Sequence, residues 1–270
     1  MPMPTGQSTG RASSPSKGYA AVSHPGAGRG IPLGWQVRLA ANCVRALWVA
    51  CHRLMHVTQQ EPPPSSRGLF IALEGGDGAG KSTQGRLLRA WLEGLGHPVV
   101  MTREPGGTEF GRIVRELVLH GDHVAPRAEA LLFAADRAHH VQTLIRPALA
   151  RGEVVVTDRY MDSSIAYQGA GRDLGVDEVR ELNVWATGGL VPALTVLVDL
   201  PTEVGRARRA GVHDRLESED DEFHSAVRKH FLALAGAEPD RYLVVDGELP
   251  PEQISQLVRV RVSTLLAGAR

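Results

Sequence analysis

The sequence predicts an α/β fold in which a parallel sheet carries helices on both faces. Short apolar stretches, several rich in β-branched residues, alternate with helical patterns from residue 69 to the end of the chain. The first apolar stretch runs directly into a glycine-rich loop and then into a helical pattern, an order typical of phosphate-binding proteins. Because ligands of such folds bind at the carboxyl ends of the strands, we expect the functional residues to follow the strands.

The elements follow from the spacing of apolar residues and from the glycines and prolines that separate them. The expected strands cover residues 69–73, 98–102, 153–157, 194–199 and 242–245. The expected helices cover residues 84–95, 108–120, 126–150, 176–187, 202–212, 223–235 and 251–266. A kink is possible at Pro147, since proline removes one hydrogen bond of a helix.

Composition and charge exclude several classes of protein. The 270 residues are 43% hydrophobic with no net charge, which suits an ordinary folded core. Residues 1–60 hold six basic residues and no acidic ones, so the rest of the chain is slightly acidic and does not indicate a nucleic-acid binder. Both cysteines, Cys43 and Cys51, lie in this first part. The remainder has no disulfide or cysteine-ligated zinc, and we expect a cytoplasmic protein without nucleic-acid or membrane partners.

We expect residues 1–66 to be a disordered extension and residues 67–270 to be the folded domain. Residues 1–34 are rich in Ser, Pro, Gly and Thr, whereas residues 35–57 carry a basic and polar stripe that would suit an amphipathic helix. The extension could be a transit peptide, a surface or partner helix, or upstream sequence without a role, with Met55 as the true initiator. We favour the last interpretation. Arginines interrupt the tract too often for it to span a bilayer.

The loop from Gly75 to Ser82 fits the phosphate-binding motif G-x-x-x-x-G-K-[ST] at every fixed position. Its glycines let backbone amides surround a phosphate, and the following helix adds its positive amino-terminal end. Lys81 would reach the β- and γ-phosphates, and Ser82 would ligate Mg²⁺. The nucleotide-binding residues predicted by the motif and its neighbours are Gly75, Gly76, Asp77, Gly78, Ala79, Gly80, Lys81, Ser82 and Thr83.

Charged residues follow two other expected strands. Arg103 can bind a phosphate with two hydrogen bonds, although taken alone it could equally be a surface residue beside a tight turn. Asp158 can hold Mg²⁺ partly through water, and Arg159 can bridge phosphates. Asp199 also ends an apolar strand and is the rival metal ligand, but Pro201 beside it favours a structural role.

The motifs EGGDGAGKSTQ, TREPGGT, LLFAADR, DRYMDSSIAYQG and DRLE, in this order, resemble those of the thymidylate kinase (dTMP kinase) family. The resemblance covers about residues 67–270. It implies a P-loop NTPase three-layer fold with a five-stranded parallel sheet, a short lid and a homodimeric assembly. It also implies transfer of the γ-phosphoryl group of ATP, with Mg²⁺, to dTMP.

The resemblance assigns roles to individual positions. Phe133 would stack on thymine, although alone it would be taken for a core residue. Arg137 would donate to a thymine carbonyl, Ser164 would meet the N3 edge of the base, and Tyr167 would crowd a 2′-hydroxyl. Gln168 lies beside Tyr167 with a less defined role. Arg103 and Arg159 would hold the acceptor phosphate, and Asp77 would contact the sugar 3′-hydroxyl or the water shell of Mg²⁺.

The loop differs from that of some family members, which carry an arginine where this chain has Gly78. The arginine-rich stretch 206–211 resembles the lid of members that place the arginine there instead. We therefore expect Arg208 or Arg209, with Arg215 as a further candidate, to close over the ATP phosphates. The alternative is a basic helix end in solvent.

Other classes of phosphate-binding protein share part of this pattern. Another nucleotide kinase, acting on a deoxynucleoside or a different monophosphate, has the same general pattern. A switch or transport ATPase is disfavoured because neither N-K-x-D nor L-S-G-G-Q occurs. A regulatory protein with a decayed site is disfavoured because Lys81, Ser82, Arg103, Asp158 and Arg159 are all present.

Overall fold

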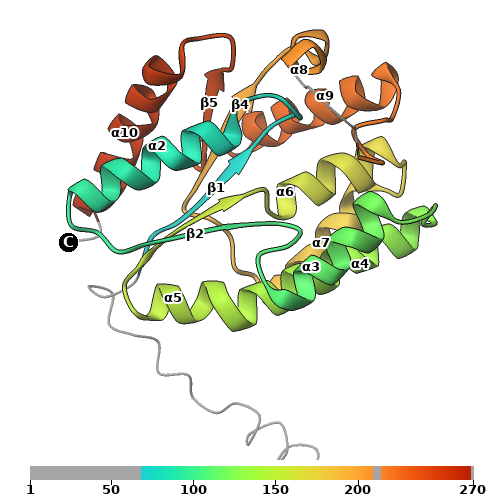
Figure 1. Cartoon of the computed structure of the whole chain (residues 1–270), viewed down its shortest axis with the longest axis horizontal. Coiled ribbons are helices and arrows are strands. Elements are labelled where there is room, and N and C mark those ends of the chain that lie inside the picture. Colours follow the sequence, from blue (N-terminus) through green and yellow to red (C-terminus); the bar gives the residue numbers. More distant parts are fainter. Residues whose placement is uncertain (1–67, 209–213, 269–270) are drawn as a thin grey trace, which may run out of the picture. The chain divides into compact units, whose positions relative to one another are not determined.

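A five-stranded parallel sheet forms the centre of the folded part (Figure 1). The computed structural model describes residues 68–208 and 214–268. The strands are β1 (Phe70–Glu74), β2 (Val99–Arg103), β3 (Val154–Asp158), β4 (Leu194–Asp199) and β5 (Tyr242–Asp246). Their order across the sheet is β2-β3-β1-β4-β5, and every neighbouring pair is parallel. The predicted fold class is confirmed, and each predicted strand is correct to within one residue.

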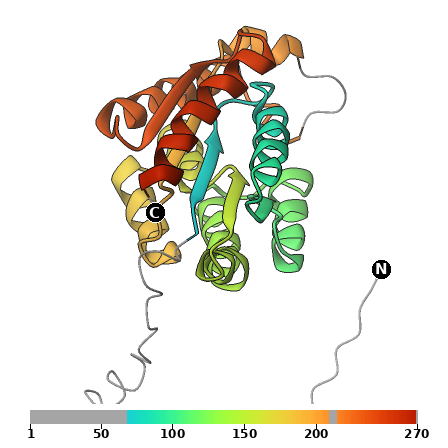
Figure 2. The same cartoon turned by 90° about the vertical axis from the view of Figure 1, so that its left-hand side faces the viewer.

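The sheet is apolar on both faces because helices cover both. Successive side chains of a strand point to opposite faces. Ile71 and Leu73 of β1 join one buried cluster with residues of α2 (Lys81–Gly94) and α10 (Pro251–Gly268). Phe70 and Ala72 join the other cluster, with residues of α4 (Pro126–His140), α7 (Val176–Thr187) and α9 (Asp221–Ala237). Figure 2 shows helices on both sides of β1. The result is three layers with two cores.

Two predicted helices contain turns of π-helix. The predicted helix 108–120 consists of α3 (Glu109–Arg115), begun by the Thr108 side chain, and η2 (Glu116–His120). The predicted helix 126–150 is built from α4, η3 (Val141–Ile145) and α5 (Arg146–Ala150). The irregular turn η3 ends two residues before Pro147, whose missing N–H cannot complete an α-helical turn.

One helical segment was not predicted. It consists of α6 (Met161–Ser164) and η4 (Ile165–Gly171), and every residue from Tyr160 to Gly169 is buried. A helix that is buried all round has no polar stripe, so it gives no amphipathic period to detect. Figure 1 shows α6 close to the end of β3.

Other predictions fall partly outside the described residues. The predicted helix 202–212 is seen as α8 (Thr202–Arg208), and residues 209–213, including Arg209, are outside the description. The same holds for the extension 1–66 and its helix at 35–57, so the domain boundary stays a prediction. In the described ranges, no helix combines the length and the apolar character that crossing a bilayer requires.

Candidate active site

The carboxyl ends of β1, β2 and β3 bring three predicted motifs to one edge of the sheet. In the register of the strands, Asp158 lies beside Leu73 on one side and Arg103 on the other. The loop after β1, Arg103 at the end of β2, and Asp158 with Arg159 at the end of β3 are therefore neighbours.

The phosphate loop is fixed by its glycines. Gly75, Gly78 and Gly80 have positive φ angles of 136°, 79° and 99°. A side chain at Gly75 would place its Cβ 2.4 Å from the carbonyl oxygen of Val198. No side chain caps α2, so the first amides of this helix point into the loop unpaired by a cap. Such amides favour an anion there.

Lys81, the first residue of α2, closes the loop. Its Nζ donates to the carbonyl oxygens of Gly75 at 3.0 Å and Gly76 at 2.7 Å. Burial lowers the pKa of Lys81, and the charge of Arg159 lowers it further. An anion at this loop would therefore relieve an unfavourable charge as well as gain hydrogen bonds.

Ser82 and Asp158 come together as predicted. The Ser82 hydroxyl donates to Asp158 Oδ2 at 2.8 Å, so two hard oxygen ligands converge below the loop. This donor set fits Mg²⁺, which takes few protein oxygens and keeps water and phosphate ligands. Among the described residues no group of three or more His, Cys, Asp or Glu could form a metal cage. Asp199, the rival ligand, instead pairs with Arg228 at 2.8 and 2.9 Å, which fits its expected structural role.

Arg159 lies at the centre of the site with a left-handed backbone, φ 69°. Its guanidinium donates to the carbonyl oxygen of Gly75 at 3.1 Å, to Ser163 Oγ at 3.0 Å and to Asp77 Oδ1 at 2.5 Å. The Tyr167 hydroxyl donates to Asp77 Oδ2 at 3.0 Å. Burial alone would raise the pKa of Asp77, but Arg159 and Lys81 hold it well below its usual range. The loop and the DRY segment are thus joined by a charged network.

Glu74, a residue that the sequence did not single out, supports this network from below. It is fully buried at the end of β1 and accepts hydrogen bonds from the amides of Tyr160 (2.8 Å) and Ser163 (3.1 Å). The Ser163 hydroxyl donates to it at 2.6 Å. Burial, with the nearby charge of Asp162, raises the pKa of Glu74 to about 7. The signal available in the sequence was an acid directly after four apolar strand residues.

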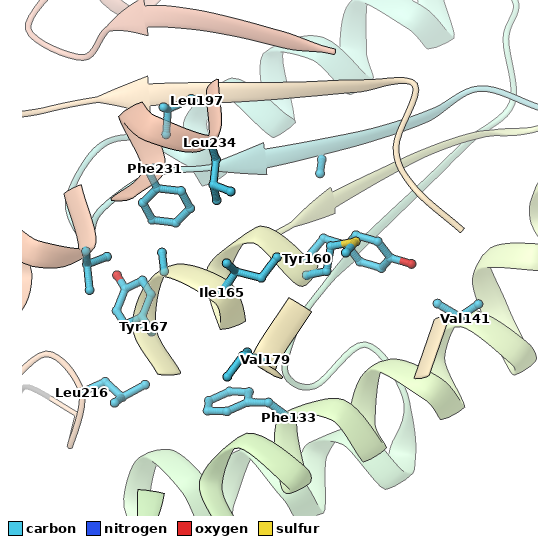
Figure 3. Close-up of a cluster of buried hydrophobic side chains, with 14 of the residues drawn as sticks. Phe133, Val141, Tyr160, Ile165, Tyr167, Val179, Leu197, Leu216, Phe231 and Leu234 are labelled. Atoms are coloured by element: carbon cyan, nitrogen blue, oxygen red, sulfur yellow. The ribbon is translucent and has the colours of Figure 1, made fainter. Parts of the chain in front are cut away.

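The residues predicted for the acceptor base also come together. Arg137 of α4 donates from Nε to Glu104 at 2.7 Å and from Nη1 to Ser164 at 2.9 Å, and also to Asn183. Phe133 lies one helical turn before Arg137 and joins the buried cluster that contains Tyr167 (Figure 3). The Gln168 amide donates to Glu129 at 2.9 Å.

One pocket of about 440 Å³ extends from the phosphate loop to the residues predicted for the acceptor base. The predicted site residues that line it are Asp77, Gly78, Gly80, Lys81, Ser82, Thr83, Arg103, Phe133, Arg137, Asp158, Arg159, Ser164, Tyr167 and Gln168. Gly75, Gly76 and Ala79 belong to the loop but are not part of this lining. The pocket therefore reaches from the phosphate loop to the aromatic and amide groups on α4 and η4.

Comparison with known proteins agrees with this arrangement. The family model described as Thymidylate kinase matches residues 73–258. The thymidylate kinase of Clavibacter michiganensis subsp. michiganensis is 61% identical over 205 residues, which cover 74% of this chain and 97% of that protein. The thymidylate kinase of a Synechococcus species is 54% identical over 204 residues, 74% and 98% of the two chains. The chain belongs to the thymidylate kinase family.

As a member of the thymidylate kinase family, the chain is an enzyme, a nucleotide-binding kinase of the dTMP kinase type. Its pocket also contains residues to which the sequence analysis assigned no role, several of them within the motifs TREPGGT, DRYMDSSIAYQG and DRLE: Glu104, Pro105, Arg115, Leu119, Ser163, Asp214, Leu216 and Glu217. Arg115 is notable because burial and the charge of Arg103 both lower its pKa. Its position on α3, away from any strand end, gave no signal in the sequence.

The expected lid arginines differ in their surroundings. Arg208 ends α8 and donates to the carbonyl oxygen of Gly247 at 2.8 Å. Helix α8 packs directly on the phosphate loop, because a Cβ at Gly78 would lie 2.4 Å from the carbonyl oxygen of Gly205. Arg215 has other partners: its Nη2 donates to Glu129 and, at 2.7 Å, to the carbonyl oxygen of Val118.

Proposed function

We propose that this member of the thymidylate kinase family transfers the γ-phosphoryl group of ATP, with Mg²⁺, to dTMP and forms dTDP for DNA synthesis. The observation that carries the proposal is that Lys81 and Ser82 line the same pocket as Phe133 and Gln168. A phosphate loop alone would suit any nucleotide hydrolase. A second, partly apolar compartment next to it suits an acceptor nucleotide.

The donor half holds ATP through the loop Gly75–Thr83. The backbone amides and Lys81 bind the phosphates, with Lys81 exchanging its carbonyl partners for the more strongly attracting phosphate oxygens. Ser82 and Asp158 would hold Mg²⁺, partly through water. When bound, the ion supplies positive charge that offsets the negative charge of the phosphates.

The acceptor half holds dTMP. Phe133 stacks on the thymine ring, Arg137 donates to a thymine carbonyl, and Ser164 meets the N3 edge, with Gln168 beside them. The supporting observation is that Glu104, Asn183 and the carbonyl oxygen of Tyr160 hold the Arg137 guanidinium rigidly. A rigid donor discriminates between bases better than a mobile one.

The sugar and acceptor phosphate lie between the two halves. Tyr167 is held by Asp77 through its hydroxyl, so its ring has little freedom to move away from an added 2′-hydroxyl. Asp77 would also contact the sugar 3′-hydroxyl or the water shell of Mg²⁺. Arg103 and Arg159 hold the acceptor phosphate, with Arg115 close to Arg103.

No general base is needed in this reaction. The nucleophile is a phosphate oxygen that is largely ionised at neutral pH, so the main obstacle is repulsion between the anionic nucleotides. Lys81, Arg103 and Arg159, joined by Arg208 or Arg209, therefore act by position and charge. Each well-placed donor is worth about 2–4 kcal/mol in the transition state.

A substrate panel tests the proposal. The full chain with Mg-ATP is offered dTMP, dUMP, UMP, CMP and thymidine in a coupled assay of ADP formation, and we expect turnover with dTMP to exceed that with the others. Lys81→Ala should lower kcat by about 100-fold or more. Lys229→Ala, which removes an exposed lysine on α9, is the matched control and should leave kcat unchanged. Preference for thymidine or a ribonucleotide would contradict the proposal.

We also propose that the enzyme is a homodimer. Phe110, Ile113 and Leu117, at the spacing of one helical face on α3 and η2, are 41%, 58% and 50% exposed. Leu131 on the adjacent α4 is 57% exposed, and the Phe110 ring contacts His139 of α4 at 5.1 Å between centroids. Such a concentration of exposed apolar side chains is typical of an interface.

The oligomeric state is measured by light scattering after gel filtration. The wild-type chain should be a dimer and Ile113→Asp a monomer. Val260→Asp on α10, where valine is 62% exposed, is the control and should remain a dimer. A monomeric wild-type chain at micromolar concentration would contradict the proposal. The cytoplasmic location expected from the sequence stays a prediction.

A further inference from the structure

Glu129 is a fully buried carboxylate that the phosphoryl-transfer chemistry does not use. It lies in the first turn of α4, one turn before Phe133. Its Oε1 accepts from Gln168 at 2.9 Å and from Arg172 at 3.4 Å, and its Oε2 accepts from Arg215. A buried charge is costly unless it is paired, so these partners hold one another in place.

Arg215 is fixed by its backbone as well as by its side chain. Its amide donates to the carbonyl oxygen of Leu119 at 3.1 Å, and its Nε donates to that of Val118 at 3.0 Å. Both acceptors belong to η2 on the rim of the pocket. Arg172 adds a second attachment, because its Nη1 pairs with Glu219 at 2.6 Å. The short segment 214–219 is therefore attached to the rest of the enzyme at residues 215 and 219.

This segment forms one side of the pocket. Asp214, Leu216 and Glu217 line the pocket, and the amides of Leu216 and Glu217 both donate to Asp214 Oδ1 at 2.9 Å. Leu216 is only 7% exposed and belongs to the buried cluster of Phe133 and Tyr167. Figure 3 shows Leu216 and Phe133 both below Tyr167.

We propose that Glu129, Arg172 and Arg215 form a clasp that holds residues 214–219 as a side wall of the acceptor pocket. Arg215 is then a positioning residue for the acceptor nucleotide and not a ligand of the donor phosphates. The inference rests on the proposed function, because the pocket is taken to hold dTMP. It replaces the expectation that Arg215 closes over ATP.

Arg215→Ala tests the clasp. Gln168 and Arg172 remain as partners of Glu129, so the fold should survive. We expect the KM and the calorimetric Kd for dTMP to rise about tenfold, equivalent to about 1.4 kcal/mol, while the KM for ATP changes less than about twofold. Arg151→Ala removes an exposed ion pair at the opposite end of β3 and should change neither constant.

Leu216→Ala tests the wall without touching the clasp and should also weaken dTMP binding. Because both changes act through the same wall, the effects in the double variant should be less than additive. Arg215→Lys keeps a cation beside Glu129, so its dTMP affinity should stay close to that of the wild type and well above that of Arg215→Ala.

Two results would overturn the inference: a lower melting temperature for Arg215→Ala with unchanged dTMP affinity, or a raised KM for ATP with unchanged dTMP affinity. A wild-type chain that binds dTMP but does not phosphorylate it would instead contradict the proposed function, and the dTMP affinities of the variants would still decide on the clasp.

Discussion

Gly78 brings the phosphate loop into direct contact with α8, and replacing it tests whether that contact positions the arginine of the lid. An alanine Cβ at Gly78 would lie 2.4 Å from the carbonyl oxygen of Gly205, whereas ordinary contact begins at 3.4 Å. The loop and α8 would have to separate by about 1 Å, and a displacement of that size can lower a catalytic rate by about 100-fold. The φ angle of 79° adds a conformational cost of about 1 kcal/mol.

Gly96 provides the matched control for Gly78→Ala. It has nearly the same backbone, φ 84°, but a Cβ there meets nothing within 4 Å. Gly96→Ala should therefore lose about 1 kcal/mol of unfolding free energy in urea denaturation and keep its kcat. Gly78→Ala should lose more stability and about 100-fold in kcat. Equal stability and equal kcat for the two variants would refute the close approach of α8 and its role.

Three further predictions concern charge. Asp136 is a buried carboxyl group on α4, and burial with the charge of Glu104 raises the pKa of Asp136 from 3.8 to about 6. Asp136 thus holds its proton more tightly in the folded protein, so the free energy of unfolding falls as pH rises from about 4 to about 6. In urea denaturation, Asp136→Asn should raise the free energy of unfolding by on the order of 3 kcal/mol at pH 8 and leave it unchanged at pH 3. Equal increases at the two pH values would contradict this prediction. Ser82→Ala should raise the Mg²⁺ concentration needed for half-maximal rate several-fold, whereas an unchanged Mg²⁺ titration would remove Ser82 from the metal site. Arg103→Ala should relieve the repulsion between Arg103 and Arg115 and so raise the melting temperature of the protein without nucleotide. The same variant should bind dTMP more weakly in calorimetry. An unchanged dTMP affinity would exclude Arg103 from the acceptor site.

The strands and the phosphate loop were predictable because their signals are local. The run 69–73 is apolar, and the motif after it fixes residue types by the demands of one turn and one helix start. The helical segment 161–171 was not predicted because residues 161–169 are all buried, so the segment has no exposed polar stripe at helical spacing.

The site was predictable where a residue follows a strand and less so where tertiary contacts decide. Asp158 and Arg103 become neighbours through parallel register alone. Arg215 looks in the sequence like any arginine of a basic lid, and only the packing of η2 and α4 gives it Val118 and Glu129 as partners. Glu74 and Arg115 likewise acquire their roles from segments far away in the sequence.

Identifying the product labelled by ATP tests the central claim most directly. The full chain is incubated with Mg²⁺, dTMP and ATP carrying a labelled γ-phosphate, and the nucleotides are then separated. We predict that the label appears in dTDP in proportion to the ADP formed, and that Lys81→Ala slows this transfer by about 100-fold or more. Label found only in inorganic phosphate, or no label in dTDP, would contradict a phosphoryl transfer between two nucleotides in one pocket.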